Sequence, residues 1–315
     1  MLKRVTQSPF DRELGFGKHV TTEGRMMNAD GSFNVVRQSL SPWDNAYYYL
    51  VTMSWWQFLL SVSAVYAVLN LLFAFLYMLA GVDGLDGMEH HDWEHRFLDA
   101  FFFSAQTLTT VGYGRISPIS VGTNIIAAIE AFTGLLGFAI VSGLMYGRFS
   151  RPRARIVFSA HILRAPFREG RALMFRMVNA RHSELIETEV QAILTVNQPG
   201  EDGKMVRRFF NLALELDKIS FFSLSWTVVH TINEESPLWG FSHQDLQNAG
   251  MEILILVKST EEANNQQVHA RYSYTAEDLV WNARFTPIVG RTRKGMPLVH
   301  TRQVNDYEVL EAVSD

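Results

Sequence analysis

Residues 107–114 read T-L-T-T-V-G-Y-G, a spacing of hydroxyl side chains and glycines that could bind a dehydrated cation. A cation leaves water only where oxygens replace its hydration shell, and backbone carbonyls can do this without fixed charge. Consecutive carbonyls face one axis only if alternate residues adopt conformations that residues with a Cβ avoid, and glycine permits these. Gly112 and Gly114 stand in alternation. The predicted ion ligands are the Thr110 hydroxyl and the carbonyls of Thr110, Val111, Gly112 and Tyr113.

The context of this stretch decides between two interpretations. A Thr/Gly-rich turn between the strands of a soluble domain is one, since a motif alone is only a hypothesis. Two long apolar runs flank the stretch, and an amphipathic segment precedes them, which favours a membrane pore. Read as T-x-x-T-x-G-Y-G, the stretch resembles the selectivity filter of potassium channels, the class of pore for which this carbonyl mechanism is known. The resemblance implies K⁺ as the permeant ion, no cofactor, and four chains around each ring of oxygens.

The two apolar runs are long enough to cross a bilayer. Trp55 to Ala80 contains no charged residue, and as a helix it extends about 39 Å, enough to span the hydrocarbon layer with tilt. Trp56 at one end and Tyr77 near the other suit the two membrane interfaces. The second run, residues 116–147, carries a single charge. A buried helix of a soluble protein is the alternative for either run, but it is rarely so long and so uniformly apolar.

The single charge in the second run is Glu130, and an ionisable residue within a membrane is a functional hypothesis by default. We expect Glu130 to lie behind the 110–114 stretch and to hydrogen-bond to it; a role in lining the pore is the alternative. Gln106 and Thr107 complete the predicted support of the stretch. Four glycines allow close packing or bending of the second run: Gly134, Gly137, Gly143 and Gly147.

The segment between the first run and the stretch is acidic and rich in histidine. Its charge could attract cations to a pore mouth, or its side chains could hold a metal. The residues concerned are Asp83, Asp86, Glu89, His90, His91, Asp92, Glu94 and His95. Residues 99–108 then predict a short helix whose C-terminal dipole favours a cation at its end.

Basic segments on both sides of the apolar runs predict how the chain is oriented. Residues 1–40 are polar and basic, the loop between the runs is acidic, and arginines follow the second run at positions 148, 151, 153 and 155. By the positive-inside rule both termini are cytoplasmic, in the inner (plasma) membrane. Arg148, Arg151, Arg153 and Arg155 are also predicted to bind anionic lipid; a pure topology signal is the alternative. Residues 42–53 predict an amphipathic helix in the headgroup layer, unless they simply begin the first span.

Residues 156–315 change character, because strand-like segments alternate there with turns. These segments are 190–196, 221–230 and 252–257, and their spacing suggests a β-sandwich. No G-x-G-x-x-G follows a strand, which disfavours a nucleotide-sensing domain. Net charge is −4 and cysteine is absent, so composition gives no case for nucleic-acid binding and excludes disulfides. The histidines are dispersed, without metal spacing or a nucleophile, which disfavours an enzyme: His161, His182, His230, His243, His269 and His300.

Beyond the filter stretch, motifs along nearly the whole chain resemble prokaryotic inward-rectifier potassium channels, the KirBac branch. The matching segments are 52–55 (T-M-S-W), 147–152 (G-R-F-S-R-P), 175–181 (F-R-M-V-N-A-R), 223–227 (S-L-S-W-T), 235–238 (E-S-P-L) and 269–271 (H-A-R). The resemblance implies a homotetramer of membrane α-helices followed by an all-β immunoglobulin-like sandwich. It divides the chain into an N-terminal arm (1–40), an amphipathic slide helix (41–54), a pore domain with two transmembrane helices, re-entrant pore helix and filter (55–148), and a cytoplasmic regulatory sandwich (149–315).

Departures from the family pattern bear on rectification and gating. Gln106 and Ile116 stand where many eukaryotic relatives carry a Glu–Arg brace, which makes Glu130 the expected substitute. Phe138 stands where strong rectifiers carry a carboxylate that lines the pore, and Lys258 lies near the position of their lower, cytoplasmic ring of blocker-binding residues. Block by Mg²⁺ or polyamines is therefore expected to be weak. Phe138 and Tyr146 are the predicted gate, Tyr146 closing the pore by dewetting. A potassium channel with another soluble domain, a membrane-anchored enzyme and a passive protein-binding module are the rival interpretations.

Overall fold

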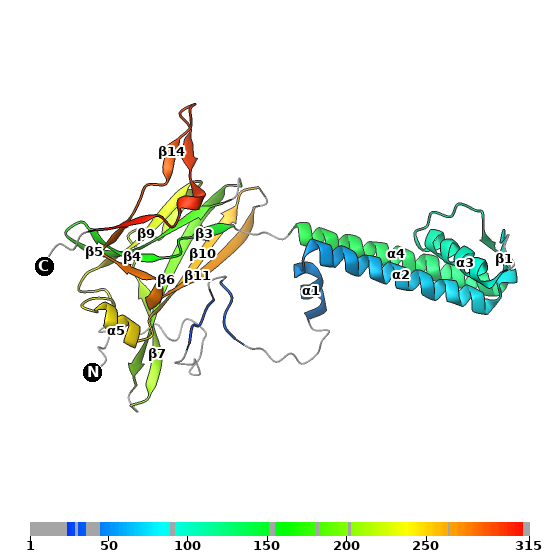
Figure 1. The fold of residues 1–315 in the computed structure, drawn as a ribbon, viewed down its shortest axis with the longest axis horizontal. Helices are drawn as coiled ribbons and strands as arrows, with labels where there is room; N and C mark the ends of the chain where they lie inside the picture. The colour runs from blue at the N-terminus through cyan, green and yellow to red at the C-terminus, as the bar shows by residue number, and fades with distance from the viewer. Residues whose placement is uncertain are drawn as a thin grey trace. The chain divides into compact units, whose positions relative to one another are not determined.

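The computed structural model describes residues 24–28, 31–35, 45–88, 92–150, 155–180, 183–200, 203–263 and 265–310. It divides into two compact units (Figure 1). The helical unit comprises residues 38–151, and the β unit combines residues 1–37 with residues 152–315. The chain therefore leaves the β unit once to build the helical unit and then returns to it.

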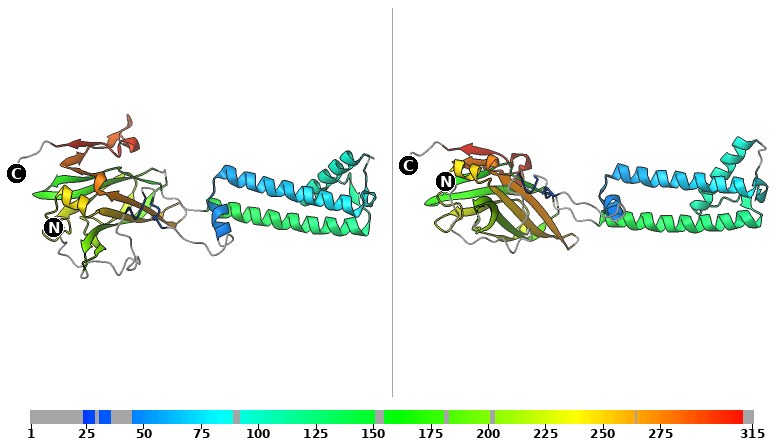
Figure 2. Two further views of the ribbon diagram at one scale, coloured as in Figure 1. Left: turned by 60° about the horizontal axis from the view of Figure 1, so that its bottom comes forward. Right: turned by 90° about the horizontal axis from the view of Figure 1, so that it is seen from below.

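The described residues of the helical unit form the helices α1 (Ala46–Thr52), α2 (Trp55–Ala80), α3 (Trp93–Leu108) and α4 (Val121–Phe149). The long helices α2 and α4 lie side by side, with the shorter α3 beside them near one end (Figure 2). A small ribbon, β1 (Leu85–Asp86) with β2 (Ser117–Pro118), joins the segments before and after α3 and follows the short 3₁₀ turn η2 (Val82–Gly84). The helix α3 begins at Trp93 and not at the predicted Asp99. Glu94 lies in its first turn, where an acidic group is favoured by the helix dipole.

The amphipathic segment and the first apolar run are separate helices. The Ser54 hydroxyl accepts a hydrogen bond from the Gln57 N–H, and the Gln57 side chain accepts one from the Ser54 N–H at 3.1 Å. This reciprocal capping starts α2 afresh after α1. Residues 41–44 of the predicted segment lie outside the described residues.

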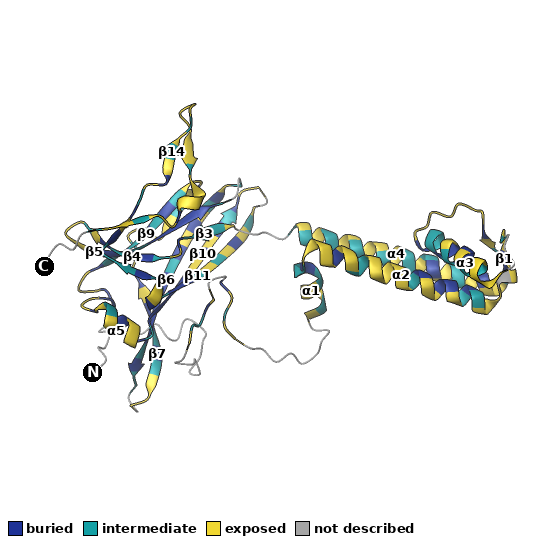
Figure 3. Cartoon of the chain, in the orientation of Figure 1, coloured by how far each residue is buried: buried dark blue, intermediate teal, exposed yellow. Residues whose placement is uncertain are grey.

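Both long helices have the length and apolar composition of membrane spans. Large apolar side chains are exposed along α2 and α4, whereas the strands of the β unit bury most of theirs (Figure 3). Isolated exposed apolar residues are ordinary on a soluble protein, but contiguous apolar surface on this scale marks an interaction with lipid or protein.

Two five-stranded sheets make the β unit a sandwich, as the sequence predicted. The first sheet has the order β11 (Gln266–Thr275), β10 (Glu252–Glu261), β6 (Leu185–Pro199), β7 (Met205–Leu212), with β8 (Lys218–Phe222) also paired to β6. The second has the order β12 (Leu279–Trp281), β4 (Ile162–Phe167), β5 (Gly170–Asn179), β3 (Ile156–Phe158), with β9 (Ser225–Ile232) also paired to β5. Side chains from both sheets, among them Leu194, Ile253 and Met177, form one continuous core.

The strand predicted over residues 221–230 is in fact two strands in different sheets. The first, β8, ends at Phe222 and pairs with β6, whereas β9 begins at Ser225 and pairs with β5. Phe222 and Trp226 are both buried and meet edge to face, with ring centroids 6.4 Å apart. Because the apolar alternation continues across the break, the sequence pattern alone does not reveal the change of sheet.

Smaller elements complete the β unit. They are the helix α5 (His243–Asn248), the 3₁₀ turns η3 (Ala276–Asp278) and η4 (Thr301–Gln303), the ribbon of β13 (Ala283–Phe285) with β16 (Tyr307–Val309), and the hairpin of β14 (Val289–Arg291) with β15 (Pro297–Val299). The β13–β16 ribbon packs through Ala283 and Phe285 onto Leu163 of β4.

A segment near the N-terminus is fastened to the first sheet. We call residues 24–28 and 31–35 the N-terminal strap. Met27 of the strap packs against Ile193, Phe209 and Leu254 of that sheet. The backbone N–H groups of Met26 and Met27 donate to the two carboxylate oxygens of Glu252, at 2.8 and 3.0 Å. The rest of the predicted N-terminal arm lies outside the described residues.

The carboxylate that holds the strap is buried and paired with an arginine. Glu252 is 1% exposed, and Arg207 Nη2 lies 3.4 Å from its Oε2. Arg207 also donates to the Gly24 carbonyl of the strap at 3.2 Å and to Thr195 Oγ1 at 2.7 Å. The strap is thereby joined to a hydrogen-bonded ion pair inside the β unit.

Candidate functional site

Within the 110–114 stretch every second residue has a left-handed backbone conformation. The φ angles are +60° at Thr110, +51° at Gly112 and +80° at Gly114. The two glycines behave as the sequence predicts. Thr110 does not follow from the sequence, because a positive φ is rare for a β-branched residue and occurs where surrounding structure imposes it.

The end of α3 takes up the N–H groups of this stretch. The Thr110 N–H donates to the Thr107 carbonyl at 3.0 Å, and the N–H groups of Val111 and Gly112 donate to the Gln106 carbonyl at 2.9 and 3.4 Å. Gln106 and Thr107 therefore support the stretch through their backbone. Among the described residues, no hydrogen bond uses the carbonyls of residues 110–113. Four successive acceptors are left available for a ligand.

Glu130 is fully buried in a polar network behind α3. One carboxylate oxygen accepts a hydrogen bond from Tyr77 Oη at 2.7 Å, and the other accepts one from Ser104 Oγ. Ser104 also lies 3.1 Å from Asn70 Oδ1. The carboxylate thus joins α2, α3 and α4. Glu130 contacts the helix that carries the stretch, where the sequence predicted a contact with the stretch itself, and its burial excludes the pore-lining alternative.

Of the four glycines that the sequence singled out in the second run, one is required by close packing at the site. A Cβ on Gly134 would lie 1.9 Å from the Leu108 carbonyl oxygen at the end of α3. A Cβ on Gly137 or Gly143 would meet nothing within 4 Å, and one on Gly147 would lie 3.2 Å from Tyr47 Oη. Gly134 therefore sets how closely α4 approaches the base of the stretch.

The segment that follows the stretch is held by contacts that the sequence analysis missed. Arg115 Nη2 lies 3.9 Å from Asp99 Oδ1, so an ion pair links the start of the predicted helix to the residue after Gly114. An acidic residue within α3 and a basic residue just after Gly114 were the available signal in the sequence. The brace positions 106 and 116 do not include either residue. Thr123 Oγ1 also donates to the Gly84 carbonyl at 2.8 Å, which fixes the segment after α2 to the start of α4.

The predicted gate residues lie on α4 with their rings exposed. Phe138 is 74% and Tyr146 75% exposed, and they stand about two turns apart. Phe138 also lines a cavity of about 620 Å³ together with Thr110 and Gly134. Large apolar rings therefore occupy α4 below the stretch.

The structure describes two of the four predicted lipid-binding arginines, Arg148 and Arg155. Arg148 donates to the carbonyls of Leu50 and Met53 at 2.5 and 2.7 Å, and its guanidinium lies 4.7 Å from the centre of the Trp55 ring. Its charge therefore caps the C-terminal end of α1. Arg155 belongs to the β unit and has an exposed side chain. Arg151 and Arg153 lie outside the described residues.

In the part of the chain that the structure describes, the remaining candidate residues form no metal cluster. Glu89, His90 and His91 of the acidic loop lie outside the described residues, and no cluster of three His, Asp or Glu side chains in the described part could hold a metal. His230 is buried in the β unit. Its Nδ1–H donates to the Ala213 carbonyl at 2.7 Å, and its Nε2 accepts from Ser236 Oγ at 2.8 Å. Burial lowers the pKa of His230, so it is a neutral core residue.

Comparisons with known proteins agree with this architecture. A family model described as "Inward rectifier potassium channel C-terminal domain" matches residues 156–314, and one described as "Ion channel" matches residues 58–150. The inward rectifier potassium channel Kirbac3.1 of Paramagnetospirillum magnetotacticum is 37% identical over 267 residues, which cover 84% of this chain and 89% of that protein.

More distant relatives come from animals. The G protein-activated inward rectifier potassium channel 2 of Rattus norvegicus is 29% identical over 287 residues, covering 84% of this chain and 67% of the relative. The inward rectifier potassium channel 4 of Homo sapiens is 30% identical over 226 residues, covering 68% and 50%. Because both halves match one kind of channel and the bacterial relative matches across most of its length, the chain belongs to the inward rectifier potassium channel family, in its prokaryotic KirBac branch, and is an ion channel and not an enzyme.

Proposed function

We propose that residues 110–113 line a K⁺-selective filter at the centre of a homotetramer. The observation that carries this proposal is the alternation of left-handed residues at 110, 112 and 114 with the N–H groups turned toward α3. One chain contributes a single column of carbonyls, so an ion is enclosed only where four copies meet. The C-terminal end of α3 adds a negative partial charge near the ion path.

The orientation and domain division form part of the same proposal. Both termini are cytoplasmic, the membrane is the inner (plasma) membrane, and the pore domain is residues 55–148 between the slide helix at 41–54 and the cytoplasmic domain at 149–315. The basic residues on both sides of the two spans support this orientation.

The substitution Gly112→Ala tests the filter. A Cβ at this position would meet no atom within 4 Å, so the effect would come from the φ of +51°. We expect K⁺ flux into liposomes to be lost or Na⁺ to be admitted, with the β unit still folded. Gly143→Ala, which also has open space but no positive φ, is the matched control. An unchanged preference for K⁺ over Na⁺ in Gly112→Ala tetramers would falsify the filter assignment.

Weak rectification is a second component of the proposal. The four copies of Phe138 around the pore of a tetramer offer Mg²⁺ or a polyamine no negative charge, so block by internal spermine is expected to be weak. Phe138→Asp places up to four carboxylates around one cavity and is expected to increase the block and its voltage dependence. Steep block of the unmodified channel by low spermine contradicts this assignment. Tyr146 is also exposed on α4. In the proposed tetramer its four copies close the pore by excluding water from it.

Anionic lipid is the proposed modulator of the channel. Because the Arg148 side chain already hydrogen-bonds to the end of α1, we propose that lipid binds to Arg151, Arg153 and Arg155. A basic residue at an anionic leaflet contributes about 1 kcal/mol, and shifts of a few kcal/mol suffice to change a conformational equilibrium. The test is flux through Arg151→Gln/Arg153→Gln channels, reconstituted with and without phosphoinositide. If phosphoinositide changes the flux of the double variant as much as that of the unmodified channel, the arginines only orient the chain in the membrane and do not bind lipid.

A further inference from the structure

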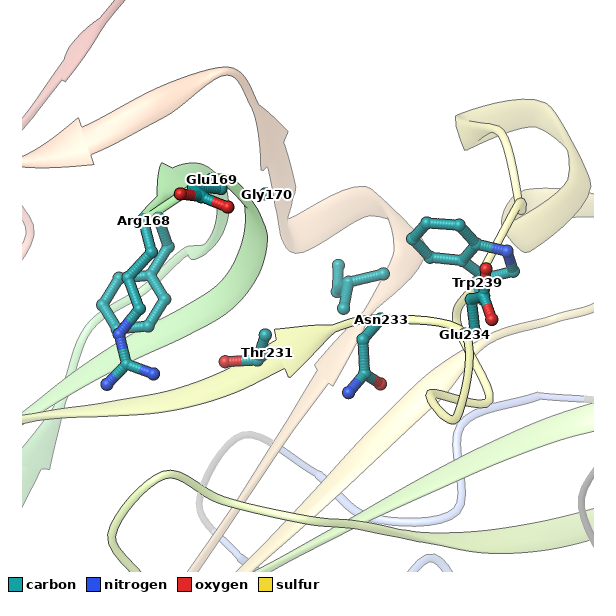
Figure 4. A pocket seen from close by; sticks show the side chains of 9 residues that line it. Arg168, Glu169, Gly170, Thr231, Asn233, Glu234 and Trp239 are labelled. Carbon is teal, nitrogen blue, oxygen red and sulfur yellow. The ribbon is translucent and has the colours of Figure 1, made fainter.

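A pocket of about 520 Å³ opens on the β unit, and none of the residues that line it belongs to the proposed conduction site (Figure 4). One wall is the tight turn that joins β4 to β5, and the other is the segment that follows β9. Trp239 and Glu234 line the second wall, and Glu169 lies at the rim of the first (Figure 4). The volume falls in the range that suits small-molecule ligands.

The positive charge at the pocket is already neutralised from within the β unit. Arg168 Nη2 lies 2.9 Å from Glu215 Oε2, and Thr231 Oγ1 donates to the same carboxylate at 2.5 Å. The Thr231 hydrogen bond and then Arg168 hold the pKa of Glu215 below its ordinary range, so this carboxylate remains ionised beside the arginine. The Arg168 charge is therefore balanced before any ligand arrives.

Two further carboxylates leave the pocket with an excess of negative charge. Glu169 and Glu234 are exposed, and within the described residues neither has a hydrogen bond or an ion pair. They project from opposite walls, one from the β4–β5 turn and one from the segment after β9. They add two negative charges to the lining of the pocket, which favours a cation as its ligand.

Aromatic surface supplies the second half of the recognition chemistry. The Arg168 guanidinium lies over the Phe167 ring at 4.9 Å, so that ring already has a cation. Trp239 is 52% exposed and has no such partner in the described chain. An open indole face beside carboxylates attracts an organic cation through the ring quadrupole, and the buried Ile232 beneath adds apolar contact.

Backbone strain fixes the first wall. Phe167 pairs with Gly170, so Arg168 and Glu169 form a two-residue turn. Arg168 adopts a φ of +52°, a conformation that glycine usually supplies at such a turn. Strained non-glycine residues persist where surrounding contacts hold them, and they concentrate at ligand sites. Here the Glu215 contact holds Arg168 and thereby keeps Glu169 at the rim.

We propose that this pocket binds a small organic cation, an alkylammonium ion whose charge is held by Glu169 and Glu234 and whose alkyl part covers Trp239. The binding is independent of conduction through the filter. A lysine side chain of another protein carries the same chemistry, so the experiment must distinguish a free amine from a peptide.

The test uses the full-length channel in lipid nanodiscs, labelled with 5-fluorotryptophan. The Trp239 resonance is identified by its loss in Trp239→Phe, and it reports this pocket even if small cations also enter the pore. n-Butylammonium is expected to shift the resonance saturably, whereas neutral n-butanol is expected to bind at least tenfold more weakly. Glu169→Gln/Glu234→Gln is expected to weaken n-butylammonium binding at least tenfold. Glu262→Gln/Glu277→Gln, which removes two exposed carboxylates elsewhere on the β unit, is expected to leave it unchanged.

Three results overturn the proposal. Equal affinities for n-butanol and n-butylammonium reduce the site to an apolar pocket. Unchanged binding in Glu169→Gln/Glu234→Gln, with the Trp226 and Trp281 resonances intact as a check of folding, removes the carboxylates from recognition. A shift produced by N-acetyl-lysine-methylamide but not by n-butylammonium makes the pocket a docking point for a protein chain.

Discussion

The helical unit and the β unit each contain a carboxylate with almost no solvent exposure, Glu130 and Glu252, and they satisfy it by different means. Glu130 in α4 receives hydrogen bonds from two neutral hydroxyl groups, those of Tyr77 and Ser104. Glu252 in β10 receives two backbone N–H groups from the strap and lies against the guanidinium of Arg207. Both carboxylates join segments that are distant in sequence.

The difference concerns what each site requires of its carboxylate. Removing one member of a buried ion pair leaves the other as an uncompensated charge, which is strongly destabilising. A group surrounded by neutral donors can be replaced by a neutral group of the same shape at the cost of ordinary hydrogen bonds. The β unit should therefore depend on the charge of Glu252, and the helical unit on the shape and polarity of Glu130.

The largest effect is expected from Glu252→Gln. This change leaves Arg207 buried without a countercharge, so we expect the β unit to lose about 3 kcal/mol of stability and the strap to become accessible to protease. Denaturant unfolding of the purified channel, followed by tryptophan fluorescence, measures the loss. Replacing both partners in Glu252→Gln/Arg207→Met should recover part of it. A loss no greater than that of the exposed control Glu262→Gln contradicts the importance of the pair.

A packing change in the helical unit should come next. Gly134→Ala forces a Cβ against the Leu108 carbonyl at 1.9 Å, and overpacking of this kind costs about 2 kcal/mol. Because Leu108 precedes the filter stretch, K⁺ flux into liposomes should also fall. Gly137→Ala lies one turn further along α4 in open space and should change neither stability nor flux. Equal behaviour of the two variants would show that α4 does not approach α3 so closely.

The comparison between Glu252 and Glu130 is tested most directly by making the same Glu→Gln change at Glu130. Glu130→Gln keeps an oxygen for Tyr77 and a polar group near Ser104, so the channel should lose less than about 1 kcal/mol. Thermal stability of the tetramer, measured beside that of Glu252→Gln, gives the contrast directly. A loss as large as that of Glu252→Gln would remove the distinction between the two units.

The smallest effect concerns pH. Burial lowers the pKa of His230 below its ordinary value of 6.5, so at mildly acidic pH the unfolded chain binds a proton that the folded β unit does not. Stability therefore falls as pH drops through the ordinary histidine pKa toward the lower folded value. His230→Gln should flatten this dependence of the unfolding midpoint, although it lowers stability overall.

Local features of the site could be predicted from sequence, and distant pairings could not. Gly112 and Gly114 predicted the backbone of the stretch because conformational freedom is a property of single residues. The polar role of Glu130 followed from its isolation in an apolar run. Arg207 and Glu252 stand 45 residues apart in strands whose pairing no local pattern specifies. The same limit hid the division of residues 221–230 between two sheets.

Arg148, which was predicted to bind lipid, shows a second limit of prediction from sequence. A basic residue at the end of a span is expected at the cytoplasmic face by composition alone. Whether its charge faces lipid or a helix end depends on where α1 runs, and the carbonyls of Leu50 and Met53 decide that question only once α1 is folded. Sequence therefore located the charge but not its partner.

The contacts of the strap also limit how many times the chain can cross the membrane between Met27 and Glu252. Met26 and Met27 precede both spans and Glu252 follows them, yet their atoms are within hydrogen-bond distance. Such contacts form only if both segments lie on the same face of the bilayer, so the intervening chain crosses an even number of times. During synthesis the strap emerges first and must wait for a sheet made some 225 residues later. It can dock only after both helices have been inserted, and a chain with one helix left outside the membrane would be unable to close this contact.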